Sequence, residues 1–217
     1  MNLVNDAILR AVKEALEKSK KRNFLQSIDL AINLRDVDLR NPANRIDMII
    51  ELPHGRGSKP AKVALIAGGE LATRAQGVAD LIIDPSEIQK LAENKRQAKK
   101  IAKKHHFFVA DATLMPVIGR YLGPILGPRG KMPRPIPPTA DPIPVIESLK
   151  RSTRLRSKDR PTMHCMVGTE DMLPEHIAEN IETVLMMLTN KLERGKSNIA
   201  SVYVKTTMGP AVRIEGW

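Results

Sequence analysis

The sequence predicts an α/β protein in which outer segments of antiparallel character flank a centre built on a parallel sheet. Apolar and polar residues alternate, as in strands with one buried face, over residues 24–34, 46–52 and 199–206. Continuous apolar runs, typical of parallel strands covered on both faces, occur at residues 63–67, 79–83 and 107–110. Helical stretches lie between these runs, and that alternation is typical of a Rossmann-like domain.

The first segment predicts a helix. Apolar residues recur at helical spacing from Leu3 to Leu16, so residues 3–19 are expected to form a helix with one apolar face. Four cations lie at its end: Lys18, Lys20, Lys21 and Arg22. They either compensate the negative end of the helix dipole or contact RNA phosphates, and the pattern leaves both open.

The remaining elements follow in order. Further helices are expected around residues 70–76, from 85 to about 102, and around 145–150. A stretch rich in proline and glycine covers residues 123–144. After about Arg156 we expect a strand at 162–167, a helix that opens at Pro174, and a final hairpin.

Composition favours a polyanionic partner. The chain carries 35 Lys and Arg against 24 Asp and Glu, and residues 66–154 alone carry 15 basic and 8 acidic side chains. Aromatic residues make up only 3% of the chain, which argues against proteins that stack single-stranded bases on several rings. A folded RNA recognised by its shape fits this inventory better.

Other classes of protein are disfavoured. The single cysteine, Cys165, excludes an internal disulfide and is typical of a reducing cytosol. The N-terminus reads as an amphipathic helix rather than a signal core, and no apolar run approaches the length of a membrane span. We therefore expect a soluble cytoplasmic protein without a membrane partner.

The turn between the last two strands is the most informative stretch. Residues 205–213 read KTTMGPAVR, where a hairpin turn usually has Asn, Asp or Ser. Gly209 would allow the backbone to approach a partner closely or to take a positive φ, and Pro210 would fix the exit from the turn. Hydroxyls, bare peptide N–H groups and a thioether can contact sugar and phosphate, whereas the alternative is an ordinary turn.

Residues 201–210, SVYVKTTMGP, resemble the C-terminal signature of a family of ribosomal proteins. This is the universal family numbered one in the large subunit, whose members belong to the mobile lateral stalk beside the tRNA exit site. Three more stretches resemble this family in order and spacing: residues 21–24, 127–133 and 164–168. The resemblance covers essentially the whole chain. The short N-terminus and the Arg-Asn-Phe form are similar to the archaeal branch.

The resemblance implies a fold of two domains. Residues 1–66 and 156–217 would form one split α+β outer domain, with an antiparallel sheet and two helices. Residues 67–155 would form an inserted Rossmann-like, three-layer α/β domain, joined to the first by two hinge strands. The outer domain would hold the primary rRNA site.

The resemblance also implies the RNA-binding residues. They are Arg22, Phe24, Ser27, Gly168, Ser201, Lys205, Thr206, Thr207, Met208, Gly209 and Pro210. From its pattern alone Phe24 could belong to the core, and only the resemblance places it at the RNA surface. Arg129 and Lys131, on a Gly-Pro loop, are secondary candidates for phosphate contact, with a solvated basic loop as the alternative.

The Rossmann-like centre raises one rival function, that of a nucleotide-dependent enzyme. No Gly-x-Gly-x-x-Gly follows a strand, and the loop at residues 127–131 is an incomplete phosphate loop. Ile125 takes the place of its first glycine, and Met132 that of its Ser or Thr. The basic run Lys95–Lys104 is either a solvated helix face or an RNA contact.

No enzymatic or metal chemistry is expected. The adjacent pairs His105–His106 and His164–Cys165 would point to opposite faces of a strand, so neither is preorganised to bind one metal. No catalytic set stands out, and no cofactor is expected.

The function implied by the resemblance is that of a structural constituent of the large ribosomal subunit. Such a protein binds the stalk region of large-subunit rRNA on the cytoplasmic ribosome and takes part in movement and release of exit-site tRNA. It would also repress translation by binding its own mRNA. Free of the ribosome, it would be a monomer.

Overall fold

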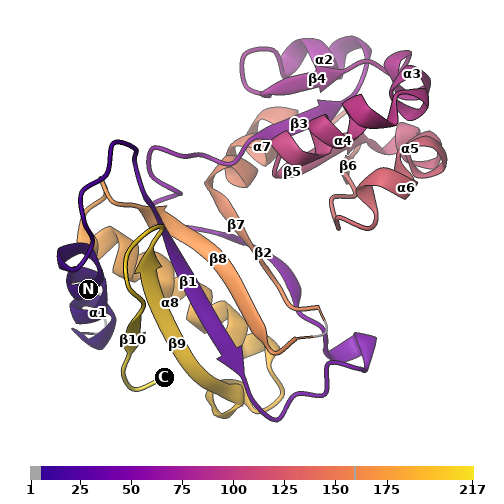
Figure 1. The fold of residues 1–217 in the computed structure, drawn as a ribbon. Helices are drawn as coiled ribbons and strands as arrows, with labels where there is room; N and C mark the ends of the chain where they lie inside the picture. Colours follow the sequence, from indigo (N-terminus) through magenta and orange to yellow (C-terminus); the bar gives the residue numbers. More distant parts are fainter. Residues whose placement is uncertain (1–5, 159) are drawn as a thin grey trace. The chain divides into compact units, whose positions relative to one another are not determined.

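The structure, a computed structural model, describes residues 6–158 and 160–217 (Figure 1). The chain divides into two compact units. The outer unit runs up to Pro60 and resumes at Arg151, and the inserted unit spans Ala61–Lys150. Leu3 and Val4, which the sequence assigns to the first helix, lie outside the described residues.

The outer unit is built on a four-stranded antiparallel sheet with the order β10-β9-β1-β8 (Figure 1). Its strands are β1 (Ser27–Leu34), β8 (Thr162–Thr169), β9 (Ile199–Thr206) and β10 (Val212–Ile214). Every second residue of β1 is buried, which is the alternation expected of a strand with one covered face. The N-terminal strand thus lies between two strands from the C-terminal part of the chain.

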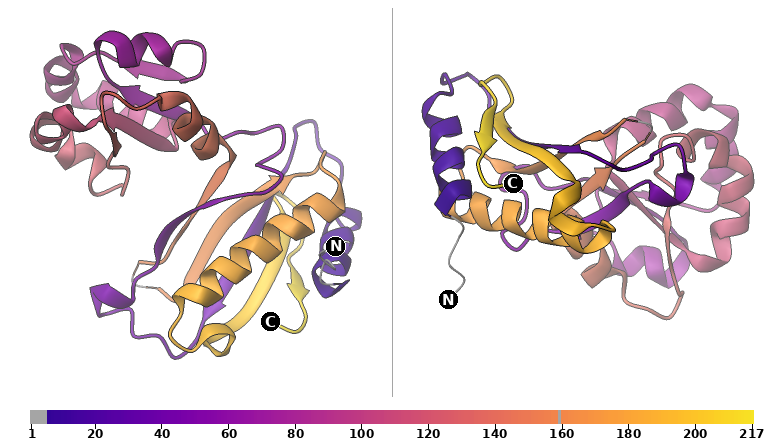
Figure 2. Two further views of the ribbon diagram at one scale, coloured as in Figure 1. Left: turned by 180° about the vertical axis from the view of Figure 1, so that it is seen from behind. Right: turned by 90° about the horizontal axis from the view of Figure 1, so that it is seen from below.

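Two helices cover the buried face of this sheet. They are α1 (Asp6–Glu17) and α8 (Pro174–Lys191), which contact each other and the strands (Figure 2). Ile8 and Val12 of α1 and Ile181 of α8 are fully buried in one core with the inward side chains of the strands. On the opposite face, none of the helices in the described part of the outer unit covers the sheet.

A second, two-stranded sheet pairs β2 (Asp47–Glu51) with β7 (Ser152–Arg156). Arg154 donates from Nε and Nη2 to the two carboxylate oxygens of Asp47, at 2.7 and 2.5 Å. Such a two-pronged contact is the strongest form of Arg–carboxylate pairing. This ladder lies in the two stretches of the outer unit that precede and follow the inserted unit in sequence.

The inserted unit has a four-stranded parallel sheet with the order β4-β3-β5-β6. The strands are β3 (Val63–Ile66), β4 (Leu81–Ile83), β5 (Phe107–Asp111) and β6 (Arg134–Ile136). The helices are α2 (Gly69–Arg74), α3 (Glu87–Glu93), α4 (Lys95–Lys104), α5 (Met115–Tyr121), α6 (Gly123–Leu126) and α7 (Pro142–Arg151). Short 3-10 turns are η1 (Pro42–Asn44), η2 (Ala112–Leu114) and η3 (Gly195–Asn198), the first and last in the outer unit.

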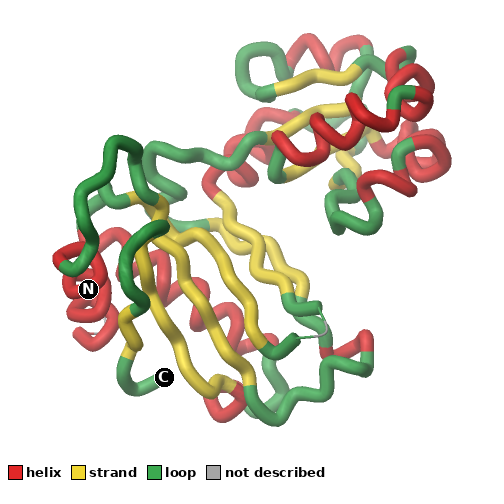
Figure 3. The backbone as a smooth tube through the Cα atoms, in the orientation of Figure 1, coloured by secondary structure: helices red, strands yellow, loops and turns green. Residues whose placement is uncertain are grey.

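Helices cover both faces of the parallel sheet (Figure 3). Val63 and Leu65 of β3 pack in a core with α2 and α7, whereas Ala64 and Ile66 pack in a second core with α3 to α6. All four residues of β3 are buried, which explains its continuous apolar sequence. The mixed α/β fold class is therefore confirmed.

The unit boundaries differ from the sequence expectation of 66/67 and 155/156. Val63–Ile66 pairs with β4 and β5, so the inserted unit begins earlier in the chain. Ser152–Arg156 pairs with β2, so the outer unit resumes earlier too. The expected helix from Pro85 to about residue 102 is divided at Asn94, whose side chain accepts from Gln97 N at 3.1 Å and caps α4.

The loop that follows β2 is fixed by a buried amide of α8. Asn180 is fully buried, and its Nδ2 donates to Gly55 O and Val167 O, both at 2.9 Å. Its Oδ1 accepts from His54 N at 3.1 Å. One side chain therefore satisfies three backbone groups that would otherwise be unpaired.

We expect Asn180→Leu to destabilise the outer unit by at least about 2 kcal/mol, because each buried polar group left unpaired costs about 1–3 kcal/mol. The matched control is Asn190→Leu, at an exposed position of the same helix, which should change stability by less than about 0.5 kcal/mol. Urea unfolding midpoints measure both. Equal midpoints would show that other contacts hold the loop.

Candidate nucleic-acid interface

Two segments far apart in sequence meet at one end of the outer sheet. The start of β1 pairs with the end of β9, with Ile28 opposite Thr206. Hydrogen bonds also join Ser27 to Thr207 and Gln26 to Met208. We call the two segments that contain these residues, 22–27 and 205–210, the turn site. Most of the residues predicted to bind RNA lie in it.

Thr207 extends the strand pairing into the turn. Its N–H donates to Ser27 O at 3.0 Å, and its hydroxyl oxygen accepts from Ser27 N at 3.0 Å. The same hydroxyl lies 3.2 Å from Ser27 O, to which it donates. The Thr207 hydroxyl therefore holds the two segments together, a role that the sequence did not indicate.

Gln26 joins four parts of the outer unit at the turn site. It is fully buried, and its Nε2 donates to Ser19 Oγ at 3.0 Å, Lys20 O at 3.2 Å and Glu170 Oε2 at 3.0 Å. Its Oε1 accepts from Met208 N at 3.1 Å. Gln26 thus connects the end of α1, the start of β1, the segment after β8 and the turn.

Sequence reasoning did not identify Gln26, although the sequence contained a signal. Residues 26, 28, 30, 32 and 34 occupy the inward positions of the alternation, and Gln26 is the polar one among apolar side chains. A polar group at an inward position must find hydrogen bonds, because burying it unpaired is costly. The exception to the pattern therefore marks the residue that organises the site.

Thr206 and Gly209 are part of the same internal network. Thr206 is fully buried, and its hydroxyl lies 2.8 Å from that of Ser19. A Cβ on Gly209 would lie 2.2 Å from Thr206 Oγ1, and Gly209 is not among the glycines with positive φ. The positive φ that the sequence allowed is not adopted, and the close approach in the structure is to Thr206 of the same chain. Close approach of the Gly209 backbone to a partner stays a prediction.

The outward side of the turn site exposes large apolar side chains. Phe24 is 50% exposed and Met208 is 59% exposed, so neither belongs to the core. Arg22 and Pro210 are also exposed. The Nζ atoms of two lysines lie close by, since Lys59 donates to Ser27 Oγ at 3.3 Å and Lys205 to Thr207 O at 3.3 Å. Apolar surface and cations are therefore presented together.

Several charged side chains lie around Asp29, close to the turn site. Burial raises the pKa of Asp29 above its ordinary value, while Lys205, opposite Asp29 in the ladder, acts against this rise. Burial also lowers the pKa of Arg56, and Asp29 partly offsets that shift. Arg56 Nη2 lies 3.0 Å from Met166 Sδ. Asp29 thus lies close to Lys205, Arg56 and Lys59, and Asp171 also lies near Lys59.

Two predicted residues are not part of the exposed turn, although Gly168 lies opposite Ile28, at the same end of the sheet. Gly168 is buried, and a Cβ there would lie 2.9 Å from Met172 Sδ, so the glycine makes room for packing. Ser201 accepts from Asn33 Nδ2 at 2.9 Å, at the opposite end of the β1–β9 ladder from Ser27. The structure does not bring either residue to the surface of the turn site.

The secondary candidates in the inserted unit hold backbone carbonyls. Lys131 Nζ donates to Ala102 O at 2.8 Å and to His105 O at 2.5 Å, so it caps the C-terminal end of α4. Arg129 Nη1 donates to Ile125 O at 2.8 Å. Both side chains therefore have structural partners, and their contact with RNA stays a prediction.

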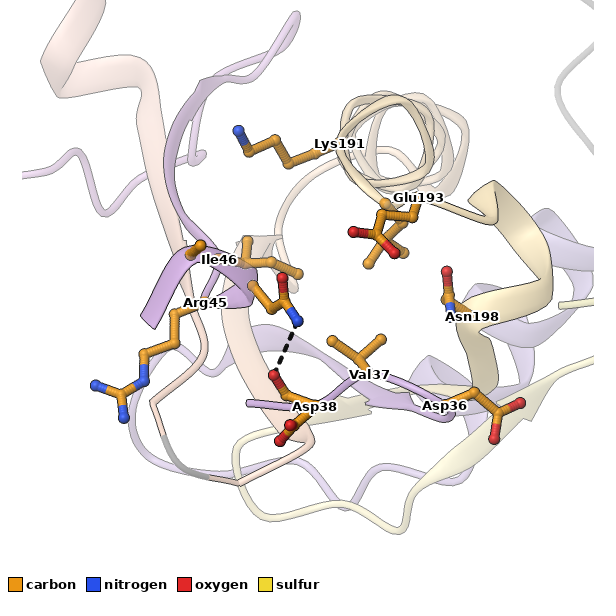
Figure 4. Close-up of a pocket in the computed structure, with 11 residues that line it drawn as sticks. Asp36, Val37, Asp38, Arg45, Ile46, Lys191, Glu193 and Asn198 are labelled. Carbon is orange, nitrogen blue, oxygen red and sulfur yellow. Dashed lines mark hydrogen bonds between the residues drawn. The ribbon is translucent and has the colours of Figure 1, made fainter. Parts of the chain in front are cut away.

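A pocket of about 150 Å³ in the outer unit lies away from the turn site (Figure 4). It is lined by Asp36, Val37, Asp38, Ala43, Asn44, Arg45, Ile46, Lys191, Leu192, Glu193 and Asn198. Asn44 Nδ2 donates to Asp38 O at 3.0 Å, and Asn198 Nδ2 donates to Arg35 O at 3.1 Å. These amides hold loops, and the pocket includes none of the predicted functional residues.

Within residues 6–158 and 160–217, no cluster of three His, Cys, Asp or Glu residues could hold a metal ion. In the same part of the chain, no helix has the length and apolar character needed to cross a bilayer. Cys165 is buried, and burial raises the pKa of its thiol to about 12. The thiol is therefore protonated at neutral pH and is a poor nucleophile.

Comparison with known proteins connects this geometry to a family. The model of the ribosomal protein L1p/L10e family matches residues 16–210. The large ribosomal subunit protein uL1 of Pyrococcus horikoshii is 53% identical over 210 residues, covering 96% of this chain and 95% of that protein. The uL1 proteins of Methanothermobacter thermautotrophicus and Thermoplasma acidophilum are 50% and 52% identical, covering 95% and 98% of this chain and 98% and 97% of their own lengths.

The close approach at Gly209 predicts a stability effect. Gly209→Ala should destabilise the outer unit by about 1–3 kcal/mol, because the added methyl displaces the Thr206 hydroxyl from Ser19. Met208→Ala, one residue earlier but mostly exposed, should change stability by less than about 0.5 kcal/mol. Chemical unfolding of the two variants measures the difference. If Met208→Ala proved the more destabilising, the described packing of the turn would be incorrect.

Proposed function

Because this chain belongs to the ribosomal protein L1p/L10e family, we propose that its outer unit binds the stalk region of large-subunit rRNA through the turn site. The chain is a structural constituent of the large ribosomal subunit, of the archaeal type, and not an enzyme. Its place is on the ribosome in the cytoplasm.

One observation carries the proposal: an exposed apolar side chain projects from a turn whose backbone is hydrogen-bonded to a buried group of the protein. Met208 is 59% exposed, yet its backbone N–H is fixed by the buried Gln26. Phe24, two residues before Gln26, is 50% exposed. Groups ordered before binding lose little entropy when a partner covers them, and covering apolar surface is favourable.

The chemistry of the turn site fits a folded RNA. Met208 and Phe24 would pack on sugars and base edges, while Arg22, Lys59 and Lys205 would meet phosphates. The site offers no set of parallel aromatic rings for stacking successive bases, in agreement with the low aromatic content of the chain. Recognition by shape and by 2′-hydroxyls follows from these groups.

The proposal extends to three finer roles. The same site would bind a stem and loop in the protein's own mRNA that presents an rRNA-like surface, and so repress translation. Since both RNAs would use one site, their binding would be mutually exclusive. We also propose that the chain takes part in movement and release of exit-site tRNA, and that it is a monomer when free of the ribosome.

We expect Met208→Ala to weaken binding to a stalk rRNA fragment by about tenfold or more, since a fully covered Met contributes about 1.5–3 kcal/mol. The matched control is Met186→Ala. Met186 is 54% exposed but lies on α8, away from the turn site, so its loss should leave affinity unchanged. Titration of the fragment with both variants measures the difference. Equal affinities of the two variants would contradict the assignment of the turn site.

A second prediction tests the outer unit alone. A chain in which a short Gly-Ser linker replaces residues 61–150 should fold, because the outer unit has its own core. At physiological salt it should bind the same rRNA fragment within about tenfold of the full chain, a difference of about 1.4 kcal/mol. If this folded chain did not bind while the isolated inserted unit did, the primary site would lie elsewhere.

A further inference from the structure

Helix α4 of the inserted unit presents a continuous basic surface. We call its six exposed cations the α4 basic face: Lys95, Arg96, Lys99, Lys100, Lys103 and Lys104. On the opposite side of the helix Ala98 and Ala102 are buried in the core of the inserted unit. The helix is therefore anchored by its apolar side, and the cations are held toward solvent.

The protein does not neutralise these charges. No ion pair joins any of the six side chains to an acid in the part of the chain that the structure describes. Neighbours four residues apart, such as Lys95 and Lys99, carry like charges, and such pairs destabilise a helix. Within the inserted unit, the α4 basic face holds six of 14 basic side chains.

Compensation of the helix dipole does not explain the pattern. Lys95 and Arg96 lie in the first turn of α4, at the positive end of the dipole, where cations are unfavourable. At the other end, the carbonyls of Ala102 and His105 already accept from Lys131 Nζ. Lys95 and Arg96 are thus placed where they disfavour the isolated helix, whereas Lys103 and Lys104 lie in its last turn, where cations are favourable. Dipole compensation therefore accounts for only two of the six cations.

We propose that the α4 basic face binds the phosphate backbone of RNA, independently of sequence, as a contact separate from the turn site. Cations four residues apart are spaced by about 6 Å along the helix axis, similar to neighbouring phosphates of a strand. The face consists of cations alone, and the exposed amide beside it, Gln97, already accepts from Asn94 Nδ2 at 3.4 Å. The face would therefore contribute affinity rather than specificity.

The test uses the full chain and an RNA duplex unrelated to the stalk. The variant Lys99→Gln, Lys100→Gln, Lys103→Gln removes three charges and keeps good helix formers. Its control, Lys90→Gln, Arg120→Gln, Arg134→Gln, removes three exposed charges elsewhere in the inserted unit. The slope of log affinity against log salt should become shallower by about 2 in the first variant and by less than about 1 in the control, because each lost phosphate contact changes it by about 0.7–0.9. Equal changes in the two variants would overturn the proposal.

Two further measurements identify the partner and separate this surface from the turn site. The titration is repeated with a stalk rRNA fragment and with deacylated tRNA, and the affinity of the α4 variant for each RNA is compared with that of the unchanged chain. Weaker binding to either RNA supports the proposal. Met208→Ala should leave the salt slope on the unrelated duplex unchanged. If poly-glutamate of equal charge competed as well as RNA, the face would be a general polyanion site, and the assignment to RNA would be overturned.

Discussion

The outer unit depends on one constraint, the position of β1 between β8 and β9. β1 comes from the N-terminal segment and its neighbours come from the C-terminal segment, so the sheet forms only when the two are brought together. The core has the same dependence, since inward residues of both segments pack with α1 and α8. The segment between the two parts of the outer unit is a long loop, and bringing its ends together costs conformational entropy. This cost grows only slowly with loop length, so the fold tolerates an inserted unit there.

Within this frame a single buried amide sets the geometry of the candidate site. Gln26 occupies an inward position at the edge of an apolar core, where an unpaired amide would be strongly unfavourable. Its hydrogen bonds to Ser19, Glu170 and Met208 satisfy it and at the same time fix the turn. The Thr206 hydroxyl bonds to that of Ser19, and Gly209 leaves room for this contact because it has no Cβ. The inner side of the turn is therefore protein structure, and its outer side, including Met208, is free for a partner.

The two units differ in the physical means that they offer for contact with RNA. The turn site combines exposed apolar side chains with a few cations on a rigid frame, which suits recognition of a particular shape. The α4 basic face consists of lysine and arginine side chains that form no ion pair with an acid in the described part of the chain, which suits contact with any phosphate backbone. Charge counts along the chain favour the inserted unit, but they do not register the neutral groups of the outer unit on which we propose that specificity rests.

The sequence by itself determined the fold class, the strands with one covered face and the identity of the exposed turn, because periodicity reports which side chains face a core. The prediction that residues around Phe24 and Met208 belong to one site came from the resemblance to a family and not from periodicity. Only the tertiary structure showed that Gln26, Thr206 and the Thr207 hydroxyl are internal supports, that Gly168 makes room for Met172, and that the inserted unit begins before Val63. The reason is physical: a local pattern fixes the direction of a side chain, whereas its partner comes from a distant segment that the pattern does not specify.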